Sequence, residues 1–293
     1  MKAMLRWLLT LPLRIAHWYT HNLARRKPAL VEPWLEAQQA RERDRIVQVS
    51  HISGDGHLVE LKFHAPTSVA LFRAETFSEK EPETLAWLDR FGGPDRLLFD
   101  IGSNIGLYSC YYAKKHSGPV IAFEPSCMNL SLLAKNVVLN DVAEQICLFT
   151  LPLAEHAGIA SFNMTDEQEG SALSSFGANY GPNGQPLEIQ LSYRLAGVGL
   201  DACIDIGLIP SSPALIKIDV DGTEQLILRG AKRTLTNQSL ASVLIEVDES
   251  FSSASEAVSI ALQAAGFMME SRQHSPMFET GPYSTSWNQI WVR

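Results

Sequence analysis

The stretch Leu97-Leu98-Phe99-Asp100-Ile101-Gly102-Ser103-Asn104-Ile105-Gly106 predicts the fold of most of this 293-residue chain. An apolar run ends at an acidic residue, a turn with two glycines follows, and residues 107–114 have the composition of a helix. A buried strand that passes through a glycine turn into a helix is typical of nucleotide-binding α/β domains. Glycine lets the backbone of such a turn approach a ligand closely, because it carries no side chain.

The same alternation of strand and helix continues after the turn. Further apolar, strand-like runs lie at residues 120–123, 146–151, 214–218 and 243–245. Helical stretches are expected at residues 129–140 and 222–235. Such alternation predicts a doubly wound, mostly parallel α/β sheet that binds its ligands at the carboxyl ends of the strands. Four of these ends carry an acid, namely Asp100, Glu124, Asp219 and Glu246.

The flanking regions predict smaller elements. Residues 267–270 and 287–292 predict a C-terminal antiparallel hairpin. Residues 46–50 and 57–64 flank Gly54-Asp55-Gly56 and predict a β-ribbon, which a helix from about residue 81 to Gly92 follows. We therefore expect a basic, helical N-terminal extension at 1–45 whose residues 32–45 are helix-permissive, an α+β region at 46–93 that leads into the core, and the main domain at 94–293.

The main domain contains one long loop, at residues 165–186. Eleven of these 22 residues are Gly, Pro, Ser or Asn. Loops of this length inside a compact domain are uncommon and frequently cover active sites. The alternative is a surface insertion without a function, because loop length alone says nothing about chemistry.

The composition excludes several classes of protein. Hydrophobic residues make up 46% and charged residues 19% of the chain, which is the balance of a folded globular protein. The formal charge of −8 argues against a nucleic-acid binder that neutralises phosphates, so no nucleic-acid partner is expected. The four cysteines show no metal-ligand spacing, which is consistent with a reduced, cytoplasmic protein. The oligomeric state is not predictable from these features.

Residues 1–27 differ from the rest of the chain in charge. They carry +6 without an acid, which leaves −14 for the remainder. Apolar and aromatic residues lie between the basic ones, so the segment has the composition of a peripheral membrane contact. Its apolar stretch is much shorter than the roughly 20 residues that span a bilayer. A helix that packs on its own domain is the alternative.

The glycine turn also bears on the cofactor. Glu124 stands 24 residues after Asp100, at the end of the second strand, where an acid can accept hydrogen bonds from both hydroxyls of a ribose. Both NAD and S-adenosylmethionine contain such a ribose. The dinucleotide fingerprint requires a glycine where this chain has Asn104, so the pyrophosphate cradle is missing. The pattern favours S-adenosylmethionine over NAD and makes an NAD-dependent oxidoreductase the weaker hypothesis.

Several motifs together resemble the FkbM-type S-adenosylmethionine-dependent methyltransferases. They are the turn Phe99–Gly106, Ala122-Phe123-Glu124-Pro125, Ile216-Lys217-Ile218-Asp219-Val220-Asp221-Gly222 and Leu228-Arg229-Gly230-Ala231. Glu81-Pro82-Glu83, Asn136 to Asn140, Leu200-Asp201 and Leu244-Ile245-Glu246 are also similar to that family. The resemblance covers about residues 70–250. One departure is Asp221, where the family more often has Glu.

The resemblance implies a Rossmann-like, seven-stranded class I methyltransferase fold and O-methylation of a hydroxyl on a sugar, glycan, glycolipid or natural product. The turn from Asp100 through Gly102, Ser103 and Asn104 to Gly106 is then expected to hold the methionine part of the cofactor. Glu124, followed by Pro125, is expected to bind the ribose. The adenine edge is assigned to the loop around Ala154 and Glu155.

Methyl transfer to a hydroxyl requires a base near the acceptor oxygen. Asp219 is the first candidate, because its strand end lies at the switch point of such sheets, and Asp221 and Glu246 come next. Asp221 could instead be a helix N-cap, and Glu246 a solvated strand end or the partner of a basic residue. No metal ligand set is predicted, although three neighbouring acids leave a divalent metal open. A catalytically inactive binding module at a membrane surface is the competing hypothesis.

Overall fold

The computed structural model describes residues 36–37, 40–209 and 212–293 and divides the chain into two units, Met1–Arg45 and Ile46–Arg293. In the first unit, residues 36–37 and 40–43 are helical, within the stretch expected to form a helix. The predicted membrane contact at residues 1–27 lies outside the described residues. Across the described ranges, every helix is too short or too polar to cross a bilayer.

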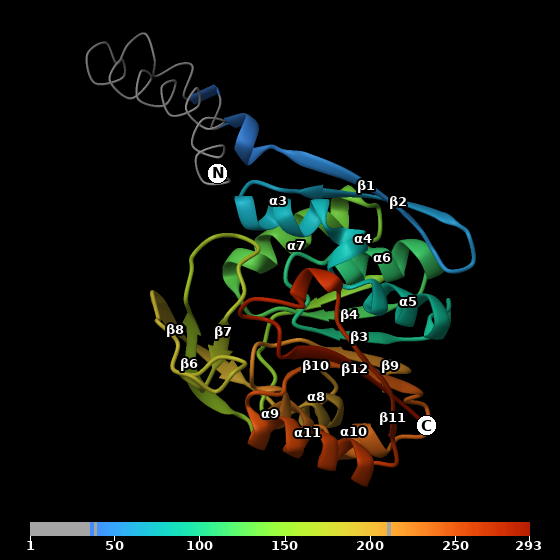
Figure 1. Cartoon of the computed structure of the whole chain (residues 1–293), viewed down its shortest axis with the longest axis vertical. Helices are drawn as coiled ribbons and strands as arrows, with labels where there is room; N and C mark the ends of the chain where they lie inside the picture. The colour runs from blue at the N-terminus through green and yellow to red at the C-terminus, as the bar shows by residue number, and fades with distance from the viewer. Residues whose placement is uncertain (1–35, 38–39, 210–211) are drawn as a thin grey trace, which may run out of the picture. The chain divides into compact units, whose positions relative to one another are not determined.

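A seven-stranded sheet forms the centre of the second unit, in the order β11-β12-β10-β9-β3-β4-β5 (Figure 1). Its parallel strands are β3 (Leu98–Ile101), β4 (Val120–Phe123), β5 (Ile146–Phe149), β9 (Leu215–Ile218) and β10 (Ser242–Asp248). Two further strands, β11 (Met268–Gln273) and β12 (Ser286–Val292), form the antiparallel hairpin at one edge. The predicted doubly wound sheet and its C-terminal hairpin are therefore confirmed.

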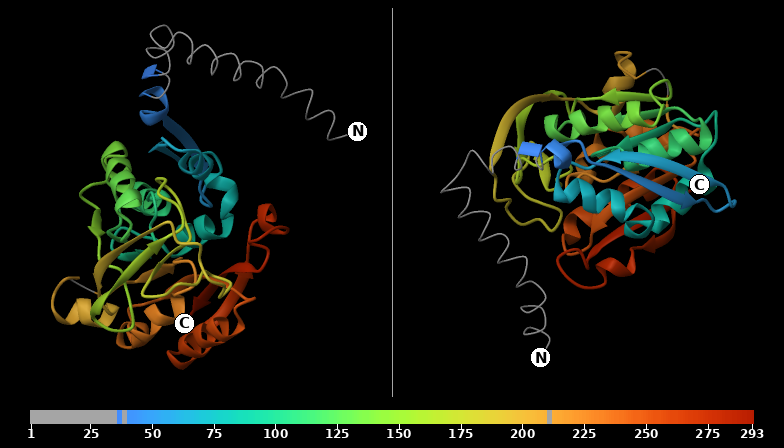
Figure 2. Two further views of the ribbon diagram at one scale, coloured as in Figure 1. Left: turned by 90° about the vertical axis from the view of Figure 1, so that its left-hand side faces the viewer. Right: turned by 90° about the horizontal axis from the view of Figure 1, so that it is seen from above.

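Alternate residues of each strand point to opposite faces of the sheet, and each face has its own hydrophobic core. In β3, Leu98 belongs to one core and Phe99 to the other. Helices α5 (Pro82–Phe91), α6 (Leu107–His116) and α7 (Cys127–Leu139) contribute to the first core. Helices α8 (Leu200–Asp205), α9 (Glu224–Arg229), α10 (Lys232–Thr236) and α11 (Ser252–Ala264) contribute to the second. Figures 1 and 2 show these two groups of helices on opposite sides of the sheet.

The predicted β-ribbon packs on the first group of helices. Strands β1 (Ile46–Ile52) and β2 (Leu58–His64) pair antiparallel. The backbone N–H of Lys62 donates to Asn140 at 2.9 Å and that of His64 donates to Asn136 at 2.8 Å, so two asparagines of α7 and its C-cap hold the free edge of β2. This attachment brings the next helices, α3 (Ser68–Glu75) and α4 (Phe77–Lys80), toward the carboxyl ends of the central strands.

Some elements differ from the prediction. The helix predicted at 222–235 is split into α9 and α10 at Gly230-Ala231, where the backbone N–H of Gly230 still bonds to Leu226 and Ile227 but the next turn restarts. The long loop contains β7 (Ser174–Phe176), which pairs with β6 (Gly158–Met164), and β6 also pairs with β8 (Leu191–Gly197). Short strands with mixed exposure of this kind carry little periodicity, so the sequence did not predict this second sheet.

Gly102 in the turn after β3 is required by the packing of the neighbouring strand end. Its φ is +84°, and an added Cβ would lie 1.8 Å from the backbone oxygen of Asp219. We expect Gly102→Ala to reduce the free energy of unfolding by about 3 kcal/mol or more, from strain and overpacking together. Gly207→Ala is the matched control, because Gly207 has a φ of +73° with open space around it and should lose only about 1 kcal/mol. Urea unfolding of both variants measures the difference, and equal losses would contradict the clash.

Candidate active site

The turn between β3 and α6 is fastened to the end of β4. The backbone N–H groups of Gly102 and Ser103 both donate to the carbonyl of Phe123 at 3.0 Å. The Ser103 hydroxyl donates to the carbonyl of Asp100 at 2.6 Å, and Asn104 adopts a left-handed conformation with a φ of +50°. These bonds place the turn beside the residue that follows β4, which is Glu124.

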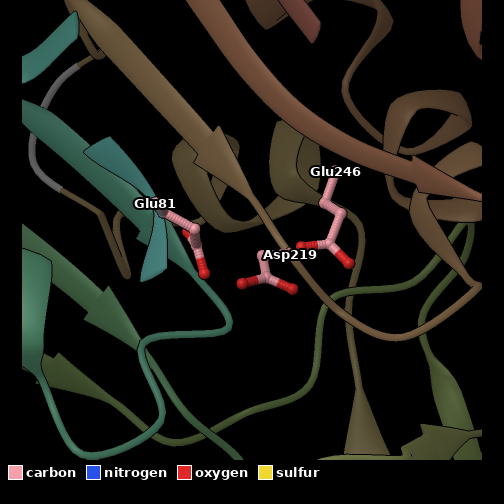
Figure 3. Close-up of side chains that lie close together, drawn as sticks. All are labelled: Glu81, Asp219 and Glu246. Atoms are coloured by element: carbon pink, nitrogen blue, oxygen red, sulfur yellow. The ribbon is translucent and has the colours of Figure 1, made fainter. Parts of the chain in front are cut away.

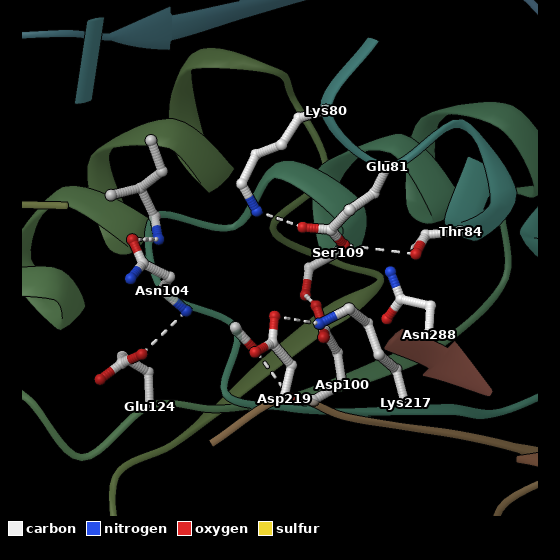
Figure 4. Close-up of polar contacts among 12 residues, drawn as sticks. Lys80, Glu81, Thr84, Asp100, Asn104, Ser109, Glu124, Lys217, Asp219 and Asn288 are labelled. Carbon is white, nitrogen blue, oxygen red and sulfur yellow. Dashed lines mark hydrogen bonds and ion pairs between the residues drawn. The ribbon is translucent and has the colours of Figure 1, made fainter. Parts of the chain in front are cut away.

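Glu124 is the best-defined polar group of this region. Glu124 is buried, with 5% of its surface exposed. Its two carboxyl oxygens accept from the backbone N–H groups of Asn104 and Ser126, each at 2.8 Å, and Figure 4 shows the bond from Asn104. Burial raises the pKa of Glu124 to about 8. Each carboxylate oxygen keeps a second lone pair, so the group can accept two more hydrogen bonds from a ligand.

Glu124 lines a small cavity of about 70 Å³. Most of the remaining wall is apolar and includes Ile101, Phe123, Pro125, Leu151, Pro152, Leu153, Phe162, Phe176, Val220 and Ile227. Ser171, Ala172 and Ser174 lie on one side, and Asn129, Asp219, Asp221 and Thr223 add polar groups. The space admits only a few water molecules as it stands. A flat heteroaromatic ring attached to a ribose fits the chemistry of this wall, and it would have to displace the segment around Ser171.

A larger cavity of about 380 Å³ lies next to the small one. Both are lined by Gly102, Asn104, Ser171, Ala172, Asp219 and Asp221, so they meet at the ends of β3 and β9. The outer wall of the larger cavity comes from α3, from the junction of α4 and α5, and from the loop before β12. A ligand in the small cavity can thus face a second molecule in the larger one across Asp219 and Asp221.

Acidic and basic side chains alternate at the base of the larger cavity. Lys217 donates to Asp219 at 3.1 Å, and Lys80 forms a close ion pair with Glu81 (Figure 4). Although burial opposes it, the Lys80 ammonium lowers the pKa of Glu81 to about 2. Asp219 and Asp100 raise the pKa of Lys217 against the effect of its burial. Lys217 thus supports the carboxylate of Asp219 from within the sheet.

Asp221 and Glu246 differ from Asp219 in their contacts. Asp221 has a φ of +58°, and its Oδ2 accepts from the backbone N–H of Leu173 at 2.7 Å. It therefore holds the long loop and does not cap α9, whose N-cap is Thr223. The side chain of Glu246 makes no hydrogen bond or ion pair with any residue that the structure describes. Burial and the charge of Asp219 raise the pKa of Glu246 well above its usual range.

The long loop covers the site at residues 169–173. The guanidinium of Arg73 donates to the carbonyl of Gly170 at 2.6 Å. The side-chain amides of Asn104 and Asn129 donate to the carbonyl of Ser171 at 2.9 and 3.1 Å. All of these bonds use polar side chains around the two cavities, so a movement of this segment would open both cavities at once.

The residues predicted to bind a cofactor occupy different places. Gly102, Asn104, Glu124 and Pro125 line the small cavity. Asp100 lies beneath the turn, where the Ser109 hydroxyl donates to its Oδ2 at 2.5 Å and its Oδ1 has no partner among the described residues. Ser103 and Gly106 belong to the turn but do not line either cavity. Their direct roles toward a cofactor stay predictions.

Ala154 and Glu155 are not among the residues that line the two cavities. Glu155 pairs with Arg229 at 3.4 Å on the surface. Leu151, Pro152 and Leu153, which precede them after β5, line the small cavity instead. The chain turns away from the cavity after Leu153, and the adenine edge at Ala154 and Glu155 stays a prediction.

Sequence reasoning missed three residues of the larger cavity, which are Arg73, Lys80 and Glu81. Glu81 was noted only as part of a helix-opening motif, and no spacing rule connects it with Asp219. His274, in the loop before β12, lines the same cavity and stacks on Trp287 at 3.7 Å between ring centroids. Aromatic Phe278 and Tyr283 complete this wall.

The raised pKa of Glu124 predicts a pH dependence of stability. The folded chain keeps this proton up to about pH 8, whereas the unfolded chain loses it near pH 4.5, the ordinary pKa of a glutamate. Stability therefore decreases as pH rises through this window, by roughly 1–2 kcal/mol between about pH 6.5 and 8. Burial lowers the pKa of His51 and His116, which acts in the opposite direction only below about pH 6.5.

Urea unfolding of the unliganded protein at pH 6.5, 7.25 and 8 measures this dependence. Glu124→Gln removes the titrating group, so its stability should vary less over the same window. Equal pH dependence in both proteins would assign the effect to other groups.

Residues 100–269, more than half of the chain, match the family model described as Methyltransferase FkbM domain. A curated relative is the hexuronic acid methyltransferase AglP of Haloferax volcanii, which is 27% identical over 153 residues, 52% of this chain and 56% of the relative. The chain thus spans about half the length of the curated relative it matches.

Two solved structures share the general arrangement. The methyltransferase FkbM from Methylobacillus flagellatus KT has a TM-score of 0.48 at 15% identity and covers 77% of this chain and 52% of its own. A precorrin-6y C5,15-methyltransferase from Geobacter metallireducens GS-15 has a TM-score of 0.43 at 15% identity, with 75% and 88% covered.

Proposed function

Because the chain belongs to the FkbM methyltransferase family, we propose that it transfers the methyl group of S-adenosylmethionine to a hydroxyl group of a sugar-containing acceptor. The observation that carries this proposal is the meeting of the two cavities at Asp219 and Asp221. One cavity suits a nucleoside and the other a polar acceptor. The hexuronic acid substrate in the name of the relative supports a sugar, and a glycan, glycolipid or other hydroxylated product fits the same chemistry.

The residues of the small cavity fit S-adenosylmethionine. Glu124 has two free lone pairs for the ribose hydroxyls, and the apolar wall from Leu151 to Leu153 suits an adenine ring. The carboxylates of Asp219 and Asp221 at the rim favour the positive charge of a sulfonium. A diphosphate would meet these same acids, which disfavours NAD here.

The cofactor supplies a methyl group on a positively charged sulfur, and the chain supplies the environment for the transfer. Glu124 orients the cofactor through its ribose. Segment 169–173 excludes water when it lies over the two cavities, and the larger cavity holds the acceptor hydroxyl opposite the small one. Alignment of this kind accounts for much of the acceleration in displacement reactions.

We propose Asp221, not Asp219, as the group that takes the hydroxyl proton. Asp219 is already engaged by the Lys217 ammonium, whereas Asp221 has no ion-pair partner among the described residues. Asp221 lines both cavities. A non-glycine residue at a φ of +58° is a strained conformation of the kind found at functional sites. Asp219 and Glu246 then act on the acceptor without taking its proton.

Two measurements test the proposed function. Calorimetric titration with S-adenosylhomocysteine, with NAD as a parallel control, should give saturable binding of the first ligand alone. Transfer of a labelled methyl group to glucuronic-acid oligosaccharides and to their neutral glucose counterparts then tests the acceptor class. Label that resists mild alkali is a methyl ether, whereas label that is released is a carboxylate ester and would overturn the hydroxyl acceptor.

Absence of S-adenosylhomocysteine binding in a folded sample would overturn the cofactor and leave the binding-module hypothesis. Binding without transfer to any sugar-containing acceptor would retain the cofactor and reject the acceptor class.

A further inference from the structure

Three carboxylates from distant parts of the chain converge at the base of the larger cavity. Glu81 precedes α5, Asp219 follows β9, and Glu246 lies in β10. One potential ligand oxygen of each lies within 4.8 Å of the others. Figure 3 shows the three groups turned toward a common space. Carboxylates that come this close repel one another unless a cation lies between them or one of them holds a proton.

The cations of the chain leave this charge only partly compensated. Six acidic side chains line the larger cavity, whereas Arg73 and Lys80 are the basic ones in its wall, and Lys217 supports Asp219 from beneath. Lys80 contacts one oxygen of Glu81 and Lys217 one oxygen of Asp219. The Oε2 of Glu81 also accepts from the Thr84 hydroxyl at 3.3 Å, whereas the second oxygen of Asp219 accepts no side-chain hydrogen bond from the described residues. Glu246 forms no ion pair with a described residue, and the Lys80 ammonium acts on it only from a longer distance.

A second, independent feature of the same cavity points to a bound ligand. Asn288 is 4% exposed and lies directly across from Glu246 in the pairing of β10 and β12. Its Nδ2 donates to Glu83 at 2.7 Å, and this bond fixes the orientation of the amide group, so that Oδ1 points away from Glu83. This oxygen is buried without a partner among the described residues, and in Figure 4 it lies on the side of the Lys217–Asp219 pair. A buried amide oxygen without a donor is unusual and suits a cation or its bound water.

We propose that Glu81, Asp219 and Glu246 bind one divalent cation, Mg²⁺ or Mn²⁺, and that Asn288 contacts the cation or a water on it. Hard cations of this kind prefer oxygen ligands and usually take six. Three carboxylates leave positions open toward the cavity, where two neighbouring oxygens of a sugar can bind. This role for the acceptor rests on the proposed function, but the binding of the cation does not.

A bound cation would also give the acidic residues different roles. Asp219 and Glu246 serve as ligands that orient the acceptor oxygen, and Asp221, outside the cluster, remains the proton acceptor. Glu81 joins them only through the packing of α4 and α5 over the sheet. A cation at this position therefore ties these helices to the carboxyl ends of β9 and β10.

Titration with Mn²⁺ tests the proposal on the full chain. The electron paramagnetic resonance signal of unbound Mn²⁺ decreases as the ion binds, so its loss measures the bound fraction. We expect saturable binding of one ion by the unaltered protein and at least a 20-fold loss of affinity in Glu246→Gln and in Asp219→Asn. Asp166→Asn is the matched control, because Asp166 lines the same cavity outside the cluster. Its affinity for Mn²⁺ should stay within about twofold of that of the unaltered protein.

Two results would overturn the site. One is no saturable binding up to millimolar Mn²⁺, which would mean that Lys80 and Lys217 supply all the compensating charge. The other is an equal loss in Asp166→Asn and Glu246→Gln, which would reduce the effect to the general charge of the cavity. Each of these two variants removes one of several negative charges that repel one another in the cavity, so we expect both proteins to fold. Thermal unfolding checks this.

Calorimetric titration of the same samples with S-adenosylhomocysteine separates this proposal from the proposed function. Binding of S-adenosylhomocysteine without Mn²⁺ binding rejects the cation site alone. Binding of Mn²⁺ without S-adenosylhomocysteine binding rejects the cofactor alone and leaves the cation site in place.

Discussion

Replacing Glu124 by alanine is expected to weaken the binding of S-adenosylhomocysteine at least 100-fold. The variant loses the carboxyl oxygens that are proposed to accept the two ribose hydroxyls, and above about pH 8, where Glu124 is charged, such hydrogen bonds contribute about 1.5–3 kcal/mol each. It also leaves the backbone N–H groups of Asn104 and Ser126 without their acceptor. The glycine turn is thus released from the end of β4 at the same time, and calorimetric titration measures the combined loss.

Two further variants separate the ribose contact from the support of the turn. Glu124→Gln keeps one acceptor oxygen but turns an NH₂ group toward a backbone donor, so we expect a loss of affinity between those of the alanine variant and the unaltered protein. Glu224→Gln is the matched control. Glu224 is also a buried acid that accepts a backbone N–H, from Gly222 at 2.9 Å, but it lies outside the wall of both cavities. Normal affinity in Glu124→Gln would reject the ribose contact.

The central strands could be predicted because parallel strands buried on both faces consist of uninterrupted apolar residues. The run at residues 120–123 matches β4 in full, and Glu124 and Asp219 directly follow the ends of β4 and β9, whereas Asp100 lies within β3. Since the carboxyl ends of parallel strands meet at one edge of the sheet, the proximity of Asp219 and Glu246 was also predictable. The pairing of β9 with β10 in register brings them side by side.

The rest of the site depends on packing that no local pattern encodes. Glu81 lies 138 positions before Asp219 in the chain, and it reaches the cluster only because α4 and α5 pack over the sheet edge. The asparagines of α7 that hold β2 are part of this arrangement. Similarly, the turn of the chain after Leu153 decides which residues face the small cavity, and loop composition does not predict the direction of a turn.

Replacing Asp221 by asparagine is expected to reduce methyl transfer by about 100- to 1,000-fold while the affinity for S-adenosylhomocysteine changes little. Proton transfer by a positioned side chain typically contributes 10²- to 10⁴-fold to a rate. An asparagine can still accept the N–H of Leu173 through its amide oxygen, so the long loop should keep its place. Single-turnover transfer of labelled methyl to a glucuronic-acid oligosaccharide measures the chemical step apart from product release.

Asp221→Glu distinguishes a proton acceptor from a purely structural residue. The resemblance to the FkbM family includes a Glu at this position, so a carboxylate one methylene longer should preserve much of the transfer, whereas the isosteric asparagine should not. A structural role would reverse this order, because asparagine keeps both the shape and the left-handed backbone more readily than glutamate does. The order of the two variants therefore decides between catalysis and support at Asp221, even before the natural acceptor is known.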